Sequence, residues 1–179
     1  MREDYSKPLI ESLEEANRDL WSACGIAPKE RAVCAVAAPG LHRKTGLLVH
    51  IDESYGVSAS ALRVATMLDL VGECSDLALY DGKEPVALVE VKIVDHPAKL
   101  IEFTNDRAKL MRQRERTGLD AYVIALIATW ETGEEIDAVL ALVHQKLGVE
   151  LPMGEVQTTT TPEPWHWRVI AERIPEPAQ

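Results

Sequence analysis

Apolar side chains recur along the chain in two distinct patterns. Over residues 7–23, apolar positions such as Leu9, Leu13 and Leu20 return at helical spacing, which predicts an amphipathic helix. Residues 120–128, in contrast, are apolar at nearly every position. Such a short continuous run is typical of a strand that is buried on both faces of a sheet. The two patterns together predict helices packed against a central sheet.

The other periodic segments, and the turn residues between them, extend this prediction over the whole chain. Helices are also predicted at 58–70, 97–117 and 132–147. Strands are predicted at 31–38, 46–51, 75–80, 86–94, 120–128 and 165–174, with a basic turn at 41–45 and a loop or linker at 157–164. This order predicts an α/β fold with a central mixed sheet flanked by helices, in a single domain over residues 1–179.

One predicted hairpin brings charged residues into an apolar setting. The pair Asp81-Gly82 is typical of a tight turn between two strands. Residues two apart on a strand point to the same side, so Glu90 and Lys92 share a face of the second strand. The hairpin folds Asp76 back beside Glu90. Three charges among apolar neighbours are unfavourable unless they pair with one another or bind a metal.

This set of side chains suits magnesium chemistry. Mg²⁺ prefers oxygen ligands, and it is held by one or two carboxylates together with water and substrate phosphate. A bound ion polarises a phosphodiester and lowers the pKa of a bound water, while a nearby lysine stabilises developing charge. Asp76 and Glu90 are therefore candidate ligands of Mg²⁺ or Mn²⁺, and Lys92 is a candidate catalytic group. The alternative is a structural ion-pair cluster in a fold without activity.

The spacing of these residues has a known counterpart. Asp76, thirteen intervening residues and Glu90-Val91-Lys92 resemble the motif of the PD-(D/E)XK nuclease superfamily. Residues 75–92 are also similar to the nuclease hairpin of type I restriction enzyme motor subunits. The resemblance implies a restriction-endonuclease-like αβββαβ core and metal-dependent hydrolysis of phosphodiester bonds in nucleic acid, DNA first. It also implies that Asp76, Glu90 and the carbonyl of Val91 bind the metal and that Lys92 is catalytic.

The chain departs from the family pattern in two places. Ser75 stands where the motif often has its proline, and the helix after the hairpin offers only Gln113 where related enzymes often offer a Gln or Tyr. A further acidic ligand often comes from the first helix of this fold. Glu14 lies nearest the edge of the apolar face of that helix, whereas Glu11 and Glu15 point farther away. Glu14 is the candidate here, and a solvated helix residue is the alternative.

The net charge of the chain disfavours nucleic-acid binding, whereas the distribution of its basic residues favours it. The formal net charge is −10, and a protein that coats DNA is usually basic because phosphate contacts supply most of its affinity. The helix predicted at 97–117 nevertheless carries a local excess of basic residues. We expect a nucleic-acid-binding surface, or else a plain solvated helix face, formed by Arg107, Lys109, Arg112, Arg114 and Arg116.

Other features set the expected partners and compartment. No apolar run reaches the roughly 18 residues of a membrane helix, so no membrane partner is expected. The three cysteines form no CxxC pair, and a reduced, cytoplasmic setting is expected. No GxxxxGK[ST] phosphate loop occurs, so any motor would be a separate subunit, and a homo-oligomer stays open. The competing functions are an inactive scaffold domain of the same fold and a hydrolase acting on RNA or small molecules.

Overall fold

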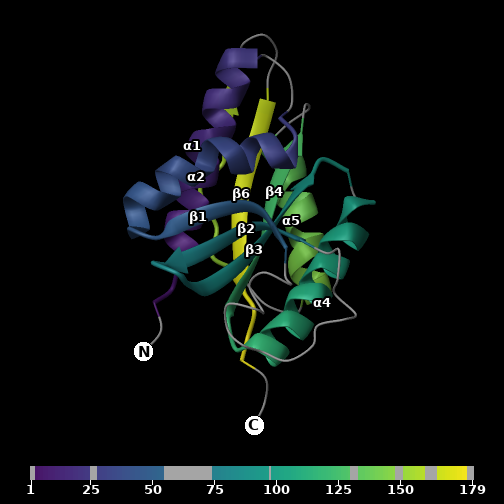
Figure 1. Cartoon of the computed structure of the whole chain (residues 1–179). Coiled ribbons are helices and arrows are strands. Elements are labelled where there is room, and N and C mark those ends of the chain that lie inside the picture. Colours follow the sequence, from purple (N-terminus) through teal and green to yellow (C-terminus); the bar gives the residue numbers. More distant parts are fainter. Residues whose placement is uncertain are drawn as a thin grey trace.

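The fold consists of one six-stranded sheet with helices on both faces (Figure 1). The computed structural model describes residues 3–24, 28–54, 74–96, 98–129, 133–147, 151–159 and 165–176. The four helices in these stretches are α1 (Ser6–Cys24), α2 (Glu30–Thr45), α4 (Lys99–Thr117) and α5 (Gly133–Leu147). The strands are β1 (Leu48–Ser54), β2 (Cys74–Asp81), β3 (Glu84–Val94), β4 (Asp120–Thr129), β5 (Gln157–Thr159) and β6 (Trp165–Arg173). The predicted α/β class with a central mixed sheet flanked by helices is confirmed.

The strand order is β1-β2-β3-β4-β6-β5. Strands β3 and β4 run parallel, and the other neighbours are antiparallel. Helices α1 and α2 cover one face of the sheet, and α4 and α5 cover the other (Figure 1). No helix in these described stretches is long and apolar enough to cross a membrane.

Strand β4 lies in the middle of the sheet and is covered on both sides. Tyr122 and Ile124 pack into the core under α1 and α2, whereas Val123 and Ala125 pack into the core under α4 and α5. Both faces of this strand are therefore buried, which explains why it is apolar at nearly every position. The strand predicted from that run is confirmed.

The strand predicted at 31–38 is wrong, because these residues belong to helix α2. A short apolar run fits a strand and a buried helix equally well when its period is not resolved. Its buried side chains, including Val33, Ala37 and Leu41, recur every four residues and face the core. The intervening small residues hid this helical period in the sequence.

Several smaller predictions need correction. The basic turn predicted at 41–45 is the last part of α2, which is capped by Gly46 in the left-handed conformation. Residues 157–159, expected in a loop or linker, form the short strand β5 and pair with β6. The helix predicted at 58–70 lies outside the described residues. The other predicted helices and strands are present, with bounds shifted by a few residues.

Pro39 lies inside α2 on its exposed side, where it cannot donate the helical hydrogen bond to residue 35. We expect Pro39→Ala to raise the free energy of unfolding by about 1–3 kcal/mol, measured by urea denaturation. Val36→Ala, an exposed control in the same helix, should change it by less than about 1 kcal/mol. A loss of stability in Pro39→Ala would contradict a regular helix at this position.

Candidate functional site

The β2–β3 hairpin splits at the end opposite its turn. The last pair in its register is Leu77 with Val89. Beyond that pair β2 stays with β1, where Ser75 pairs with Glu53, while β3 continues alongside β4 as far as Val94. Among the residues that the structure describes, no strand therefore pairs with the end of β3 on its β2 side. If this register is extended by one position, Asp76 on β2 lies opposite Glu90 on β3.

Two carboxylates replace the missing strand. The main-chain N–H of Val91 donates to Asp76 Oδ2 at 2.7 Å, and that of Ile93 donates to Glu30 Oε1 at 3.0 Å. Buried main-chain donors need acceptors, and a charged acceptor gives a stronger hydrogen bond than a neutral one. The split thus brings Glu30, from the first turn of α2, to the same strand end as Asp76.

Asp76 is held against β3 and lies beside Glu90, whose side chain is within hydrogen-bonding reach. Burial raises the pKa of the Asp76 carboxyl above its ordinary value, although the hydrogen bond from the Val91 amide and a hydrogen bond between the Asp76 and Glu90 side chains act in the opposite direction. The N–H and C=O of one strand residue face the same side of the strand. The Val91 carbonyl therefore faces the same side as the amide that binds Asp76.

Glu90 is almost completely buried, with 4% of its surface exposed. Its Oε1 lies 2.7 Å from Nζ of Lys109, which comes from α4. The same ammonium donates to the carbonyl oxygen of Cys74 on β2 at 3.2 Å. Lys109 thus contacts both strands across the split.

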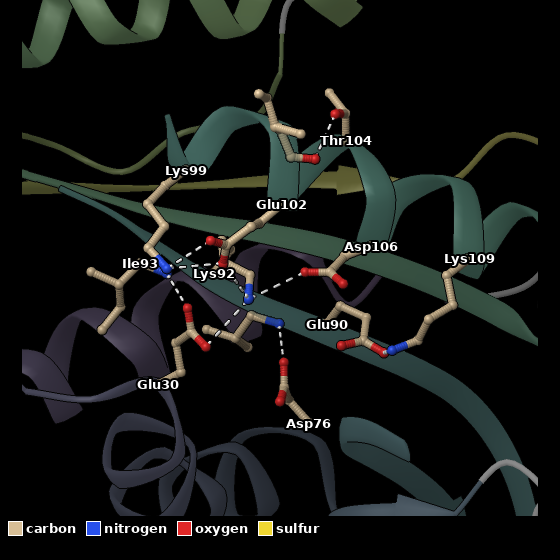
Figure 2. Close-up of polar contacts among 12 residues, drawn as sticks. Glu30, Asp76, Glu90, Lys92, Ile93, Lys99, Glu102, Thr104, Asp106 and Lys109 are labelled. Carbon is tan, nitrogen blue, oxygen red and sulfur yellow. Dashed lines mark hydrogen bonds and ion pairs between the residues drawn. The ribbon is translucent and has the colours of Figure 1, made fainter. Parts of the chain in front are cut away.

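Lys92 extends from β3 into a group of three carboxylates (Figure 2). Its Nζ lies 3.4 Å from Glu30 and from Asp106, and 3.7 Å from Glu102. Burial alone lowers the pKa of Lys92, but Asp106 and Glu30 outweigh this effect and hold the pKa above its ordinary value. Lys92 is consequently an ammonium group at neutral pH and donates hydrogen bonds rather than accepting a proton.

The side chains around the split form an unbalanced set of charges (Figure 2). We call this set the split-end cluster: Glu30, Asp76, Glu90, Glu102 and Asp106, with Lys92, Lys99 and Lys109. Five carboxylates against three ammonium groups leave two negative charges. One divalent cation carries the charge that balances the cluster.

The structure brings the predicted Asp76, Glu90 and Lys92 to one strand end and adds acids that the sequence prediction missed. Glu30 was missed because the residues directly after it, 31–38, were predicted to be a strand, whereas Glu30 begins helix α2. Glu102 and Asp106 had a detectable pattern: with Lys109 they stand at positions i, i+4 and i+7 of α4, on one side of that helix.

Glu14 is not part of the split-end cluster, which corrects the expectation that it completes the site. The Glu14 carboxyl group lies against Gly154, so close that a side chain at position 154 would not fit. The charged neighbours of Glu14 include Arg18 and Glu155. Burial raises the pKa of its carboxyl. The helical phase of α1 turns Glu14 toward residues 151–155, and Glu30 of α2 is the acid that an N-terminal helix contributes.

The basic surface predicted on α4 is also smaller than expected. Arg107 binds Glu172 at 2.7 Å, and Arg114, only 4% exposed, binds Asp120 at 2.9 Å. These side chains and Lys109 are engaged in ion pairs with the sheet. Arg112 and Arg116 are the members of the predicted set that are exposed.

The donor set fits an open magnesium site rather than a closed one. Among the residues that the structure describes, no three His, Cys, Asp or Glu side chains form a ready metal-binding group. A magnesium site needs only one or two carboxylates, because water and substrate oxygens complete the shell. Asp76 and Glu90, adjacent and partly or fully buried, meet that requirement, and Val91 offers its carbonyl on the same side.

Comparison of the chain with protein-family models, with curated proteins and with solved structures gives no match.

Asp76→Asn should stabilise the metal-free protein at neutral pH, because it keeps an acceptor for Val91 and removes a buried charge beside Glu90. A carboxyl whose folded-state pKa is raised contributes stability at low pH that is lost as the pH rises through that pKa. We expect a melting temperature at pH 7 in chelator that is higher by roughly 2–4 °C, the shift that about 1 kcal/mol produces in a domain of this size.

The same comparison near pH 4, close to the ordinary Asp value of 3.8, should show a smaller difference between the two proteins. The exposed Asp95→Asn is the matched control and should leave the melting temperature unchanged at both pH values. A variant at Asp76 that melts below the wild type at pH 7 would mean that the bond to Val91 outweighs the burial of the charge.

Proposed function

We propose that this protein is a metal-dependent nuclease that hydrolyses phosphodiester bonds, with DNA as the first candidate substrate. Asp76 and Glu90 would hold Mg²⁺ or Mn²⁺, and Lys92 would be the catalytic ammonium. The observation that carries the proposal is that these three side chains meet at the split end of β3. The split-end cluster around them has two more carboxylates than ammonium groups.

The arrangement of elements supports a restriction-endonuclease-like core. In the described part of the chain, the order is a helical segment, the antiparallel strands β1–β3, helix α4 and the parallel strand β4. This order accommodates an αβββαβ core with α2 as an additional helix. The candidate residues lie on β2 and β3, which is where a PD-(D/E)XK protein carries its motif.

Each of these side chains has its own role in the proposed reaction. A bound divalent cation supplies a polarised phosphodiester and a water of lowered pKa. The amide of Val91 orients the Asp76 carboxylate, and Glu90 adds a second oxygen ligand from the neighbouring position. Lys92 stays protonated, so its ammonium orients the attacking water and stabilises negative charge that develops on the phosphate.

A second candidate function is a non-catalytic domain of the same fold that serves as an interaction or scaffold subunit. The observation that favours it is the pairing of both site lysines, since Lys92 and Lys109 already neutralise carboxylates of the cluster. A net charge of −10 also favours it, because nucleic acid is a polyanion. Metal binding and cleavage separate the two functions.

The biological setting follows only by analogy with proteins of this fold. Restriction, phage defence and DNA processing in the cytoplasm are the contexts that we propose. A motor activity would come from a separate subunit.

The direct test is incubation with plasmid, linear and single-stranded DNA, and with RNA, in Mg²⁺ or Mn²⁺. We expect cleavage that chelator prevents, and its loss in Asp76→Asn, Glu90→Gln and Lys92→Met, because each change removes a metal ligand or the ammonium. Glu15→Gln, on the exposed side of α1, is the control and should retain activity. More than a tenth of wild-type activity in all three site variants would remove these residues from the mechanism.

Binding of nucleic acid tests the remaining basic surface of α4. Reversing the charges of Arg112 and Arg116 to Glu should weaken DNA binding and reduce the slope of log affinity against log salt, by about 0.9 for each phosphate that is no longer neutralised. Arg43→Glu, an exposed charge reversal on α2, is the control. Equal affinities and equal salt slopes in all of these proteins would exclude this part of α4 from the interface.

A further inference from the structure

We propose that Lys109 is a displaceable counter-ion of the metal site: its ammonium stands on Glu90 in the metal-free protein and leaves when a divalent cation binds. The proposal rests on the proposed function for the identity of the cation. It adds a residue of α4 to the site.

The contacts of Lys109 place it at the split. Its Nζ lies 2.7 Å from Oε1 of Glu90 on β3 and 3.2 Å from the carbonyl oxygen of Cys74 on β2 (Figure 2 shows the pair with Glu90). The two side chains of the ion pair are 18% and 5% exposed. A nearly buried carboxylate without a counter-charge is strongly unfavourable, so the metal-free fold needs this ammonium.

Lys109 neutralises only one of the two adjacent acids. Asp76 and Glu90 lie within hydrogen-bonding reach of each other, and burial raises the Asp76 pKa. One ammonium offsets a single charge of this pair, whereas a divalent cation offsets both. Magnesium also demands close contact with its carboxylate oxygens, which an ammonium at hydrogen-bonding distance from Glu90 obstructs. The two cations therefore compete for the Glu90 carboxylate.

Lys92 and Lys109 differ in a way that decides which of them moves. Lys92 is shared among Glu30, Asp106 and Glu102, so its ammonium keeps its acidic partners when Asp76 and Glu90 take up a metal. Lys109 binds one of the proposed metal ligands directly. Its flexible four-carbon stem allows the ammonium to swing from Glu90 toward the opening of the split.

The test is calorimetric titration of the full chain with Mn²⁺ and Mg²⁺, together with melting in chelator and in metal. Lys109→Met should bind the metal on the order of ten-fold more tightly than wild type, because a competing charge is gone. Lys109→Met should also have a lower melting temperature than wild type in chelator, and its melting temperature should rise more than that of wild type when metal is added. Lys109→Arg, which keeps a cation on Glu90, should bind like wild type.

Lys44→Met is the matched control. Lys44 pairs with Glu15 at 2.9 Å near the end of α2, about 20 Å along the helix axis from Glu30 at its start. Lys44→Met removes an ion pair that lies away from the cluster and should leave metal affinity unchanged. If Lys109→Met does not fold, the second measurement uses the wild type: the ¹³C NMR signal of dimethylated Lys109 should shift on addition of Mg²⁺, and should not shift in Asp76→Asn.

The outcomes separate the two proposals. If wild type and Lys109→Met bind the metal with equal affinity, the counter-ion proposal is overturned. If Asp76→Asn also abolishes binding in both proteins, the metal site itself stays in place. An unshifted Lys109 signal in metal-saturated wild type would overturn the counter-ion proposal in the same way. No metal binding by either protein, with or without DNA, would overturn both this proposal and the nuclease function.

Discussion

The site depends on one structural constraint: in the described part of the chain, the end of β3 pairs with β4 but with no strand on its β2 side. A strand inside a sheet must satisfy its main-chain donors, and beyond Val89 the neighbouring strand has turned away. The donors of Val91 and Ile93 are satisfied by carboxylates instead. Ionised acceptors thereby enter a region that the rest of the fold keeps apolar. Lys92, next to Glu30, supplies positive charge that partly offsets these carboxylates.

The split also allows the two faces of the sheet to meet. Elsewhere the strands separate the core under α1 and α2 from the core under α4 and α5. At the split, Glu30 from α2 and Asp106 from α4 contact the same ammonium of Lys92. Helices on opposite faces thus contribute to one electrostatic unit. Two negative charges remain after the lysines of the cluster are counted, and this excess favours binding of a cation.

Much of this arrangement was predictable from short-range patterns. The alternation on β3 correctly placed Glu90 and Lys92 on one side, and the Asp–Gly turn correctly brought Asp76 back to them. The apolar run of β4 identified a strand buried on both faces. These features depend on neighbours within about twenty residues, and local sequence rules describe such neighbours well.

What the sequence did not reveal depends on long-range packing. The small residues of α2 gave no resolved period, so a strand was predicted from residue 31 onward, and Glu30 was not recognised as the start of a helix or as a partner of Lys92. The inward turn of Arg114 is fixed by Asp120 at the start of the next strand, and no periodicity of α4 alone shows it. Glu14 was chosen from the edge of a helical face, whereas the segment that covers it, around Gly154, lies 140 residues away in sequence.

The separation between partners has a consequence for how the site comes into being. The contacts of Glu30 with β3 join residues 62 and 63 positions apart, and the ion pair of Glu90 requires α4 to be docked. Closing such loops lowers the chain entropy before the contacts form, so high-contact-order features assemble with the complete topology. The hairpin that carries the recognisable motif is therefore not an autonomous functional unit. The chemistry of its three charged residues is a property of the finished fold.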